Sequence, residues 1–359
     1  MGDVDSVNVW SHQASRRSTW VLVEVVADGT RGVGELSDGA PLDALVNAAC
    51  SVSSVVMGLP LDVARTTLRR QLEKLRTAGE NAFLWSTVLG GYEAAFADLQ
   101  ARLEGRPLST SLGLGEPQPV RLYANLNRRY GGDGPDAILA AAADAVSNGF
   151  AAVKVAPFLD NHARGMTGAQ LVDAGIELVA LVRDALPSGV PLMADCHHLV
   201  PADLLNVVVR ELAPMRLHWV EDLVQIGDRS GMESAAAGGL ALAAGEHIWD
   251  PEIAAAACAS GALRYWLVDP KHAGGPVGVV RIAEAVGAAQ LTFHNPSGPV
   301  GTAHAAHLAG LAGTTTWLEY AWGEADRTAF LEPAEPVNDG FIRPTGPGIG
   351  CRPRSRRKE

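Results

Sequence analysis

The sequence is poor in cysteine, in long apolar runs and in basic residues, and each shortage excludes a class of protein. Four cysteines occur among 359 residues, far apart and without Cys-x-x-Cys spacing, so we expect neither a disulfide framework nor a zinc site. No run of about 18 apolar residues could span a membrane, and no signal peptide opens the chain. The net charge is −11, so no basic face is available to neutralise nucleic-acid phosphates. We therefore expect a cytoplasmic protein without a membrane or nucleic-acid partner.

What the sequence does contain is typical of a globular protein with a large core. Hydrophobic residues make up 47% of the chain and charged residues 19%, a balance found in folded rather than disordered proteins. A length of 359 residues suffices for a barrel of roughly 200–250 residues and a smaller domain. Positive charge gathers at residues 352–358, which we expect to be a solvated chain end.

The strongest pattern is a series of short apolar runs that each end in a polar residue. The residues at their ends are Asp195, Glu221, Glu246, Asp269, His294 and Glu319. They follow one another at intervals of roughly 25 residues, about one β-strand, one helix and two loops. Such a period indicates successive βα units, whose parallel strands all end on the same side. We therefore expect these side chains to converge at the C-terminal face of a (β/α) barrel, where catalytic residues of that fold lie.

Three of these residues, Asp195, Glu221 and Glu246, are carboxylates at the ends of consecutive strands. Gathered together they would repel one another, so they need a cation. Ligation by oxygen alone favours Mg²⁺, with Mn²⁺ or Ca²⁺ as substitutes. A bound Mg²⁺ would keep open positions for the carboxylate of a small-molecule substrate. It would also make the proton α to that carboxylate removable, by stabilising the negative charge that develops on the carboxylate oxygens.

The region before the barrel predicts an α+β unit. Residues 19–26 and 32–36 are rich in β-forming residues and flank an Asp28-Gly29 turn, which indicates a hairpin. Helical periodicity follows at residues 41–57, 61–76 and 81–104. Gly and Pro at 112–119 mark a boundary, and the expected units are residues 1–118, 119–320 and 321–359. Residues 1–19 carry no clear pattern.

Several short motifs occur in a fixed order along the chain. They are Val153-Lys154-Val155, Ala194-Asp195-Cys196-His197, Val220-Glu221-Asp222, Gly245-Glu246-His247, the run from Val268 to Gly275, Phe293-His294-Asn295-Pro296 and Leu318-Glu319-Tyr320. As an ordered set they resemble the enolase superfamily, in its mandelate racemase-like branch. The resemblance implies a (β/α)7β TIM-type barrel with an α+β N-terminal capping domain, to which residues 321–359 return. Loops of that domain would close over the barrel mouth, and residues 28–32 and 37–41 are the candidates.

The resemblance also implies catalytic roles. Asp269 and His294 look like the dyad of that branch, in which the aspartate orients the imidazole and the histidine takes the α-proton. His197 matches the general acid of galactonate dehydratase-like acid-sugar dehydratases, and on an extended strand it would face the barrel mouth. Lys154 would pair with the substrate carboxylate, or else form a strand-end ion pair. Glu319 would donate a hydrogen bond to the same carboxylate, which requires a raised pKa.

This sequence departs from the family pattern at two places. Many members have Lys-x-Lys at the end of the second strand, whereas this chain has Lys154-Val155-Ala156 and lacks the second base. The family's usual Glu-Glu-Pro is Glu221-Asp222-Leu223, so Asp222 is an alternative ligand or a neighbour of the ligands. Other polar residues nearby are expected to be structural, namely His198, Lys271, His304 and His307.

Three functions remain open. The leading hypothesis is a Mg²⁺-dependent acid-sugar dehydratase, a hydro-lyase in which His294 removes the C2 proton and His197 protonates the departing 3-hydroxyl, giving a 2-keto-3-deoxy acid. An epimerase or racemase of a hydroxy acid or amino acid derivative is the alternative, with His197 as the second base. From another class, the barrel could be a non-catalytic metal-binding protein or a Schiff-base aldolase that uses Lys154. Such barrels often form symmetric assemblies, so we expect a homo-oligomer.

Overall fold

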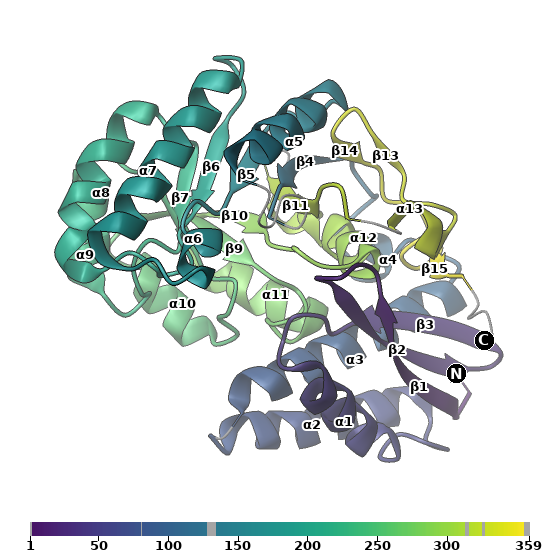
Figure 1. Cartoon of the computed structure of the whole chain (residues 1–359). Helices are drawn as coiled ribbons and strands as arrows, with labels where there is room; N and C mark the ends of the chain where they lie inside the picture. Colours follow the sequence, from purple (N-terminus) through teal and green to yellow (C-terminus); the bar gives the residue numbers. More distant parts are fainter. Residues whose placement is uncertain (1, 80, 128–133, 313–315, 325–326, 355–359) are drawn as a thin grey trace.

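The parallel strands that the sequence predicts form a closed barrel (Figure 1). The computed structural model describes residues 2–79, 81–127, 134–312, 316–324 and 327–354. The barrel strands are β4 (Val120–Asn125), β5 (Val153–Val155), β6 (Leu192–Asp195), β7 (Trp219–Glu221), β8 (Leu242–Ala244), β9 (Leu263–Val268), β10 (Gln290–Phe293) and β11 (Trp317–Ala321). They pair in chain order, and β11 closes the barrel on β4. The barrel fold with a smaller N-terminal sheet is therefore confirmed.

The barrel owes its stability to two layers of buried side chains. Because residues alternate along a strand, one set points outward and packs against the helices, and the other points into the barrel. The inward set near the amino ends of the strands is bulky and aromatic, and it includes Tyr123, Trp219, Tyr265 and Trp317. The rings of Trp219 and Tyr265 lie 5.1 Å apart. This aromatic plug occupies the barrel near the amino ends of the strands and leaves the carboxyl ends to other side chains.

Helices alternate with the strands and cover the outside of the barrel (Figure 1). The main ones are α5 (Pro135–Ser147), α7 (Gly168–Ala185), α8 (Leu205–Leu212), α9 (Arg229–Ala237), α10 (Pro251–Cys258), α11 (Gly275–Ala285) and α12 (Pro299–Leu308), with a short α6 (Leu159–Ala163). Gly149 ends the first of them with φ +86°, a backbone conformation that favours glycine. The alanine-rich sequence before this glycine favours a helix.

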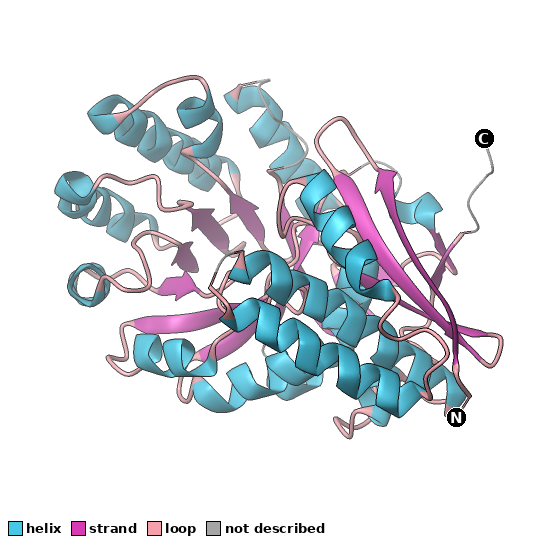
Figure 2. Ribbon diagram, turned by 90° about the horizontal axis from the view of Figure 1, so that it is seen from below, coloured by secondary structure: helices cyan, strands magenta, loops and turns pink. Residues whose placement is uncertain are grey.

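The N-terminal part is an antiparallel sheet packed against helices (Figure 2). Its elements are β1 (Val4–Gln13), β2 (Thr19–Ala27), β3 (Thr30–Glu35), α1 (Leu42–Ser53), α2 (Leu61–Thr77) and α3 (Ala82–Leu103), followed by a short α4 (Leu108–Ser111). The predicted hairpin is β2–β3, with Asp28 and Gly29 at its turn. The strand β1 was not predicted, because several of its residues are half-exposed and give no clear alternation.

Helix α3 joins the two parts of the molecule. It contacts the sheet through β3 and the barrel through α11. The approach is close at Gly90, where a Cβ atom would lie 1.9 Å from the carbonyl oxygen of Lys271. Almost every face of the helix is therefore buried, unlike the one-sided burial of α2. This contact places the capping domain directly behind the loop that follows β9.

The C-terminal segment contacts both parts. A hairpin of β13 (Val337–Asn338) and β14 (Phe341–Ile342) extends the barrel sheet at β4. Beyond it, the Ile349 backbone N–H donates to Asp98 Oδ1 of α3 at 2.8 Å. The short α13 (Arg327–Phe330) leads into β12 (Leu331–Glu332), which pairs with β15 (Arg352–Pro353). The side chain of Arg352 is 71% exposed, as expected for a solvated basic end, although its backbone pairs with β12. Residues 355–358 lie outside the described ranges. Within those ranges, no helix has both the length and the apolar character needed to cross a bilayer.

Candidate active site

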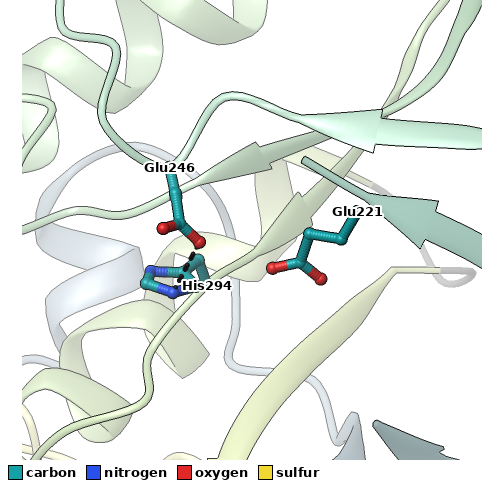
Figure 3. A group of neighbouring side chains, drawn as sticks. All are labelled: Glu221, Glu246 and His294. Carbon is teal, nitrogen blue, oxygen red and sulfur yellow. Dashed lines mark ion pairs between the residues drawn. The ribbon is translucent and has the colours of Figure 1, made fainter. Parts of the chain in front are cut away.

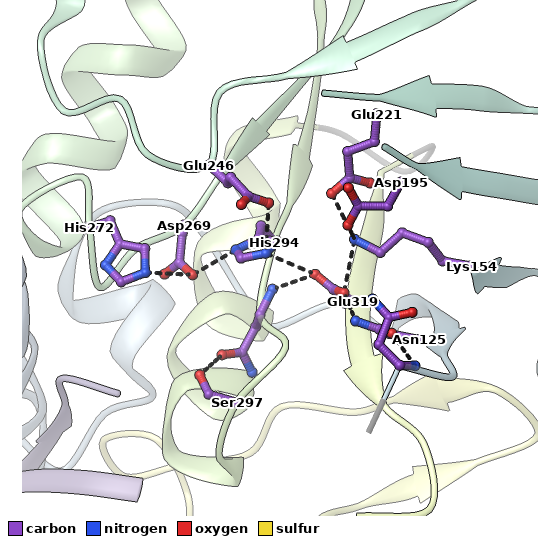
Figure 4. A network of polar contacts seen from close by, with 12 residues as sticks. Asn125, Lys154, Asp195, Glu221, Glu246, Asp269, His272, His294, Ser297 and Glu319 are labelled. Atoms are coloured by element: carbon purple, nitrogen blue, oxygen red, sulfur yellow. Dashed lines mark hydrogen bonds and ion pairs between the residues drawn. The ribbon is translucent and has the colours of Figure 1, made fainter. Parts of the chain in front are cut away.

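Each of the barrel strands contributes one buried polar side chain to a common cluster at the carboxyl ends (Figure 4). In strand order they are Asn125, Lys154, Asp195, Glu221, Glu246, Asp269, His294 and Glu319. The convergence that the spacing predicted is therefore present. Asn125 was missed, although it ends the first strand as the others end theirs. The signal was available, but a lone asparagine after an apolar run carries little information.

Lys154 lies among three carboxylates on one side of this cluster. Its Nζ is 2.7 Å from Glu221 Oε1, 3.0 Å from Glu319 Oε1 and 3.4 Å from Asp195 Oδ2. Asp195 and Glu221 are direct partners in the β6–β7 register, which brings their carboxylates side by side. Glu221 also accepts a hydrogen bond of 3.0 Å from Trp219 Nε1. The strand-end ion pair that the sequence left open is therefore the observed state of Lys154.

Glu246 lies on the other side of the cluster and pairs with His294 (Figure 3). The distance from His294 Nε2 to Glu246 Oε2 is 2.9 Å. Ligand atoms of Glu221, Glu246 and His294 all lie within 4.8 Å of one another, a grouping that could hold a metal ion. This group differs from the predicted set, since it contains His294 in place of Asp195. Asp195 remains adjacent through Glu221 and the shared Lys154.

The charges at this end of the barrel fit a divalent cation. Among the described residues, the buried acids here are Asp195, Glu221, Asp222, Glu246, Asp269 and Glu319, and the buried lysines are Lys154 and Lys271. Burial and the neighbouring carboxylates raise the pKa of Glu221 well above its ordinary value, although Lys154 opposes the shift. These buried acids outnumber the buried cations at this end of the barrel, even with His294 counted among the cations. The carboxylate oxygens of these acids, with such an excess of negative charge, suit Mg²⁺.

Asp269 and His294 form the predicted dyad. The distance from His294 Nδ1 to Asp269 Oδ2 is 2.9 Å, so the ring presents Nε2 to the centre of the barrel. Burial opposes the charge on Asp269, but Lys271, whose Nζ lies 2.8 Å away, outweighs it and lowers the pKa of Asp269. Burial likewise opposes a charged imidazole, but Glu246 and Glu319 raise the pKa of His294 well above its ordinary value. The geometry is that of a histidine held in one orientation by an ionised aspartate.

Comparison with known proteins shows the family of this chain. Residues 137–357 match the family model described as "Enolase C-terminal domain-like". The chain belongs to the enolase superfamily. A mandelate racemase/muconate lactonizing enzyme-like protein from Rubrobacter xylanophilus has the same fold, with a TM-score of 0.86, 24% identity, and coverage of 98% of this chain and 95% of that one. A member of the superfamily from Salmonella Typhimurium gives a TM-score of 0.84 at 22% identity and covers 99% and 97% of the two chains.

Two curated relatives are named as dehydratases. The D-gluconate dehydratase of Thermoproteus tenax is 26% identical over 361 residues, which cover 97% of this chain and 71% of the relative. The D-galactonate dehydratase of Xanthomonas euvesicatoria is 28% identical over 298 residues, covering 81% of this chain and 75% of the relative. Both are therefore similar to this superfamily member over most of their length.

The expected ionisation of Glu319 is wrong for this member of the enolase superfamily. We expected a protonated side chain with a raised pKa. Burial does act in that direction, but Lys154 and His294 outweigh it and lower the pKa of Glu319. Both its oxygens act as acceptors, from the Asn125 side-chain amide, from Lys154 and from the Asn295 backbone N–H at 3.1 Å. Glu319 is therefore an ionised acceptor, and it has no proton to donate to a substrate.

Strand alternation does not place His197, contrary to our expectation, although the residue remains at the site. Strand β6 ends at Asp195, and both His197 and His198 have positive φ, 48° and 54°. The chain is thus turning at His197, and strand alternation does not set its direction. Its Nδ1 still lies 3.3 Å from Asp195 Oδ1, an electrostatic contact that lacks hydrogen-bond geometry. A third of its side chain is exposed, which leaves the ring accessible from the barrel mouth.

The residues expected to be structural have structural partners. His198 Nε2 lies 3.3 Å from Asp222 Oδ2, and this contact raises the pKa of His198. Lys271 Nζ contacts Asp269 and, at 2.8 Å, Asn295 Oδ1. His304 and His307 are buried in α12, and His304 Nε2 lies 2.7 Å from the Val33 carbonyl oxygen. None of the four was assigned to the chemistry, and their contacts agree with that.

Two loops were expected over the barrel mouth, and the expectation is wrong for residues 28–32. They form the β2–β3 turn, at the opposite end of β3 from Glu35, which contacts the barrel helix α12. The β1–β2 turn lies near the barrel instead, since Ser18 Oγ donates to Glu324 Oε2 at 2.6 Å. The error follows from missing β1, because the turn between β1 and β2 could not be recognised without it. Residues 37–41 begin two positions after Glu35, and Gly39 among them lies against Thr87 of α3.

Proposed function

We propose that this protein is a Mg²⁺-dependent acid-sugar dehydratase. The observation that carries the proposal is the Asp269–His294 dyad, whose Nε2 faces a cluster of buried carboxylates, with His197 in the turn that follows β6. The similarity to a D-gluconate and a D-galactonate dehydratase supports the same class of reaction. The substrate would be a small sugar acid with a proton at C2 and a hydroxyl at C3.

The residues that would hold the metal are Asp195, Glu221 and Glu246. They come from three neighbouring strands and supply only oxygen ligands. When bound, Mg²⁺ would stabilise the negative charge that develops on the substrate carboxylate as the α-proton leaves. Lys154, which already lies between Asp195, Glu221 and Glu319, adds a fixed positive charge beside the same position.

Proton abstraction falls to His294. With Nδ1 bonded to Asp269, the ring can accept a proton only at Nε2. Against the effect of burial, Glu246 raises the pKa of this ring, and a metal held by Glu246 would offset that charge and let Nε2 act as the base. Asp269 is held ionised by Lys271 and stabilises the imidazolium that results. Because the ring is buried, its orientation is fixed before substrate binds, which reduces the cost of reaching the reactive geometry.

Elimination requires an acid on the other side of the substrate. The C2–H electrons form a C2–C3 double bond as the C3–O bond breaks, and the departing hydroxyl takes a proton from His197 to leave as water. In the closed barrel, β6 and β10 are four strands apart in either direction, which supports an arrangement in which His197 and His294 would approach a central substrate from opposite sides. The enol product then tautomerises to a 2-keto-3-deoxy acid.

An epimerase remains the second candidate, because the same opposed histidines could exchange the C2 proton between two faces. The absence of a lysine at position 156 removes the base that a racemase of this family would otherwise use. A Schiff-base aldolase is disfavoured by the state of Lys154. Burial would lower its pKa, but Glu221 and Glu319 outweigh burial and raise the pKa well above its ordinary value, so the amine stays protonated.

The test is incubation with Mg²⁺ and a panel of sugar acids that includes D-gluconate and D-galactonate, followed by trapping of 2-keto acids with semicarbazide. A trapped product supports the dehydratase. Exchange of the C2 proton in D₂O without any keto product would favour the epimerase over the dehydratase. If neither a keto product nor proton exchange is detected, the result would favour a non-catalytic barrel. Light scattering would test the homo-oligomer that we also propose.

A further inference from the structure

A carboxylate of the capping domain lies at the start of barrel helix α12, four residues after the catalytic candidate His294. Glu35, the last residue of β3, is 2% exposed. Its Oε1 accepts from the Gly298 backbone N–H and its Oε2 from the Gly301 backbone N–H, both at 2.7 Å. The first N–H groups of a helix have no partner within the helix, and a carboxylate there satisfies them. A side chain of one domain thus caps a helix of the other.

The fit between Glu35 and α12 is close on all sides. A Cβ atom at Gly298 would lie 2.6 Å from Glu35 Oε2, so no larger residue could stand there without moving the carboxylate. One turn further along, His304 Nε2 lies 2.7 Å from the carbonyl oxygen of Val33, two residues before Glu35. The end of β3 therefore contacts α12 both at its amino end and near its middle.

Asn295 connects this capped helix to the dyad. Its Nδ2 donates to the Gly298 carbonyl oxygen at 3.2 Å and to Thr302 Oγ1 at 2.7 Å. Its Oδ1 accepts from Lys271 Nζ at 2.8 Å, and the same Nζ donates to Asp269 at 2.8 Å. Asp269 in turn binds His294, the neighbour of Asn295 in sequence. The contacts form a closed loop through the first turn of α12.

We propose that Glu35 is a positioning residue for the Asp269–His294 dyad, acting through the first turn of α12 and Asn295. The role in catalysis rests on the proposed function, whereas the effect on the ring does not. Without the cap, the first turn of α12 loses two hydrogen bonds across the domain interface, and the two partners of Asn295 on that turn, the Gly298 carbonyl oxygen and Thr302, are held less firmly. The carboxylates on β6, β7 and β8 are attached to other elements and keep their places.

The test uses the full-length protein with Glu35→Gln, in which one acceptor oxygen is replaced by an NH₂ group that faces a backbone N–H. We expect kcat to fall on the order of 10- to 100-fold, as for a displaced catalytic group. The KM for the sugar acid and the Mg²⁺ concentration that gives half-maximal activity should change little. With C2-deuterated substrate the primary isotope effect should rise, because proton abstraction becomes slower. Glu35→Asp, which keeps the charge, should recover part of the loss. Glu24→Gln, on β2 in the same sheet, is the matched control.

Two readouts do not depend on activity. Hydrogen exchange of residues 294–308 should be faster in Glu35→Gln than in the control. In protein labelled with ¹⁵N-histidine, the ring signals of His294, assigned with a His294→Asn variant, should shift or broaden. If those signals and kcat both stay unchanged while exchange in α12 rises, Glu35 is only a structural cap and the inference is overturned. If no sugar acid turns over in the unmodified protein, the proposed function fails, and the ring signals alone still decide whether Glu35 positions His294.

Discussion

Lys154→Met would remove one cation from the middle of three buried carboxylates. Glu221, Glu319 and Asp195 all lie within 3.4 Å of Nζ, and the lysine side chain is fully buried. Removing one partner of a buried ion pair typically costs about 3–5 kcal/mol, because the remaining charge keeps its desolvation penalty. We therefore expect the free energy of unfolding to fall by about that amount. For a chain of this size, the midpoint of thermal unfolding would fall on the order of 10 °C.

The assay is thermal unfolding followed by circular dichroism, with EDTA and with Mg²⁺. Lys74→Met, at an exposed position on α2, is the matched control and should change the midpoint little. Adding Glu221→Gln to Lys154→Met should restore part of the loss, since it removes one of the unpaired charges. Mg²⁺ should stabilise Lys154→Met more than the unmodified protein if the carboxylates hold it. An unchanged midpoint for Lys154→Met would refute the reasoning, because it would mean that these carboxylates are not in a desolvated site.

Three further predictions follow from the site and from α12. His197→Gln should abolish formation of the 2-keto acid but retain C2 proton exchange in D₂O, measured by NMR, since His294 is untouched; loss of both would show that His197 is not the acid alone. Asp195→Asn should weaken Mg²⁺ binding measured by calorimetry, and unaltered affinity would remove Asp195 from the ligand set. Burial lowers the pKa of His307 from 6.5 to about 4. The unfolded chain therefore binds a proton more readily, so stability is lost as pH falls from 6.5 to 4, by about 3 kcal/mol from this residue. His307→Gln should flatten that part of the denaturation-versus-pH curve, and an identical slope would contradict the assignment.

The barrel and most of its polar cluster were predictable because their signal is local and repeated. A residue such as Asp195 or Glu319 ends an apolar run, and the βα period alone then brings the run ends to one side. The ionisation of Glu319 was not predictable in this way, because it depends on Lys154, which lies far away in sequence and reaches it only in the closed barrel. A sequence shows which acids are buried together but not which of them a lysine will contact.

The prediction of the direction of the His197 side chain was wrong for a different reason. The period-two rule holds only while the chain stays extended, and the chain leaves that conformation after Asp195. Nothing in the run Asp195-Cys196-His197-His198 marks the turn, since none of these residues is Gly or Pro. Similarly, Glu35 was read as part of a hairpin, and its contact with α12 joins residues 263 positions apart. Contacts between the two domains are long-range, so periodicity cannot reveal them.

Trp219 belongs to both halves of the barrel. Its ring packs in the aromatic plug beside Tyr123 and Tyr265, while its indole N–H holds one oxygen of Glu221. A change in the charge or ligation of that carboxylate would therefore alter the electric field at an indole that is rigidly packed. The near-ultraviolet absorption or fluorescence of Trp219 should therefore report on the acid cluster without any added label. A Trp219→Phe variant would identify the part of the signal that comes from this residue.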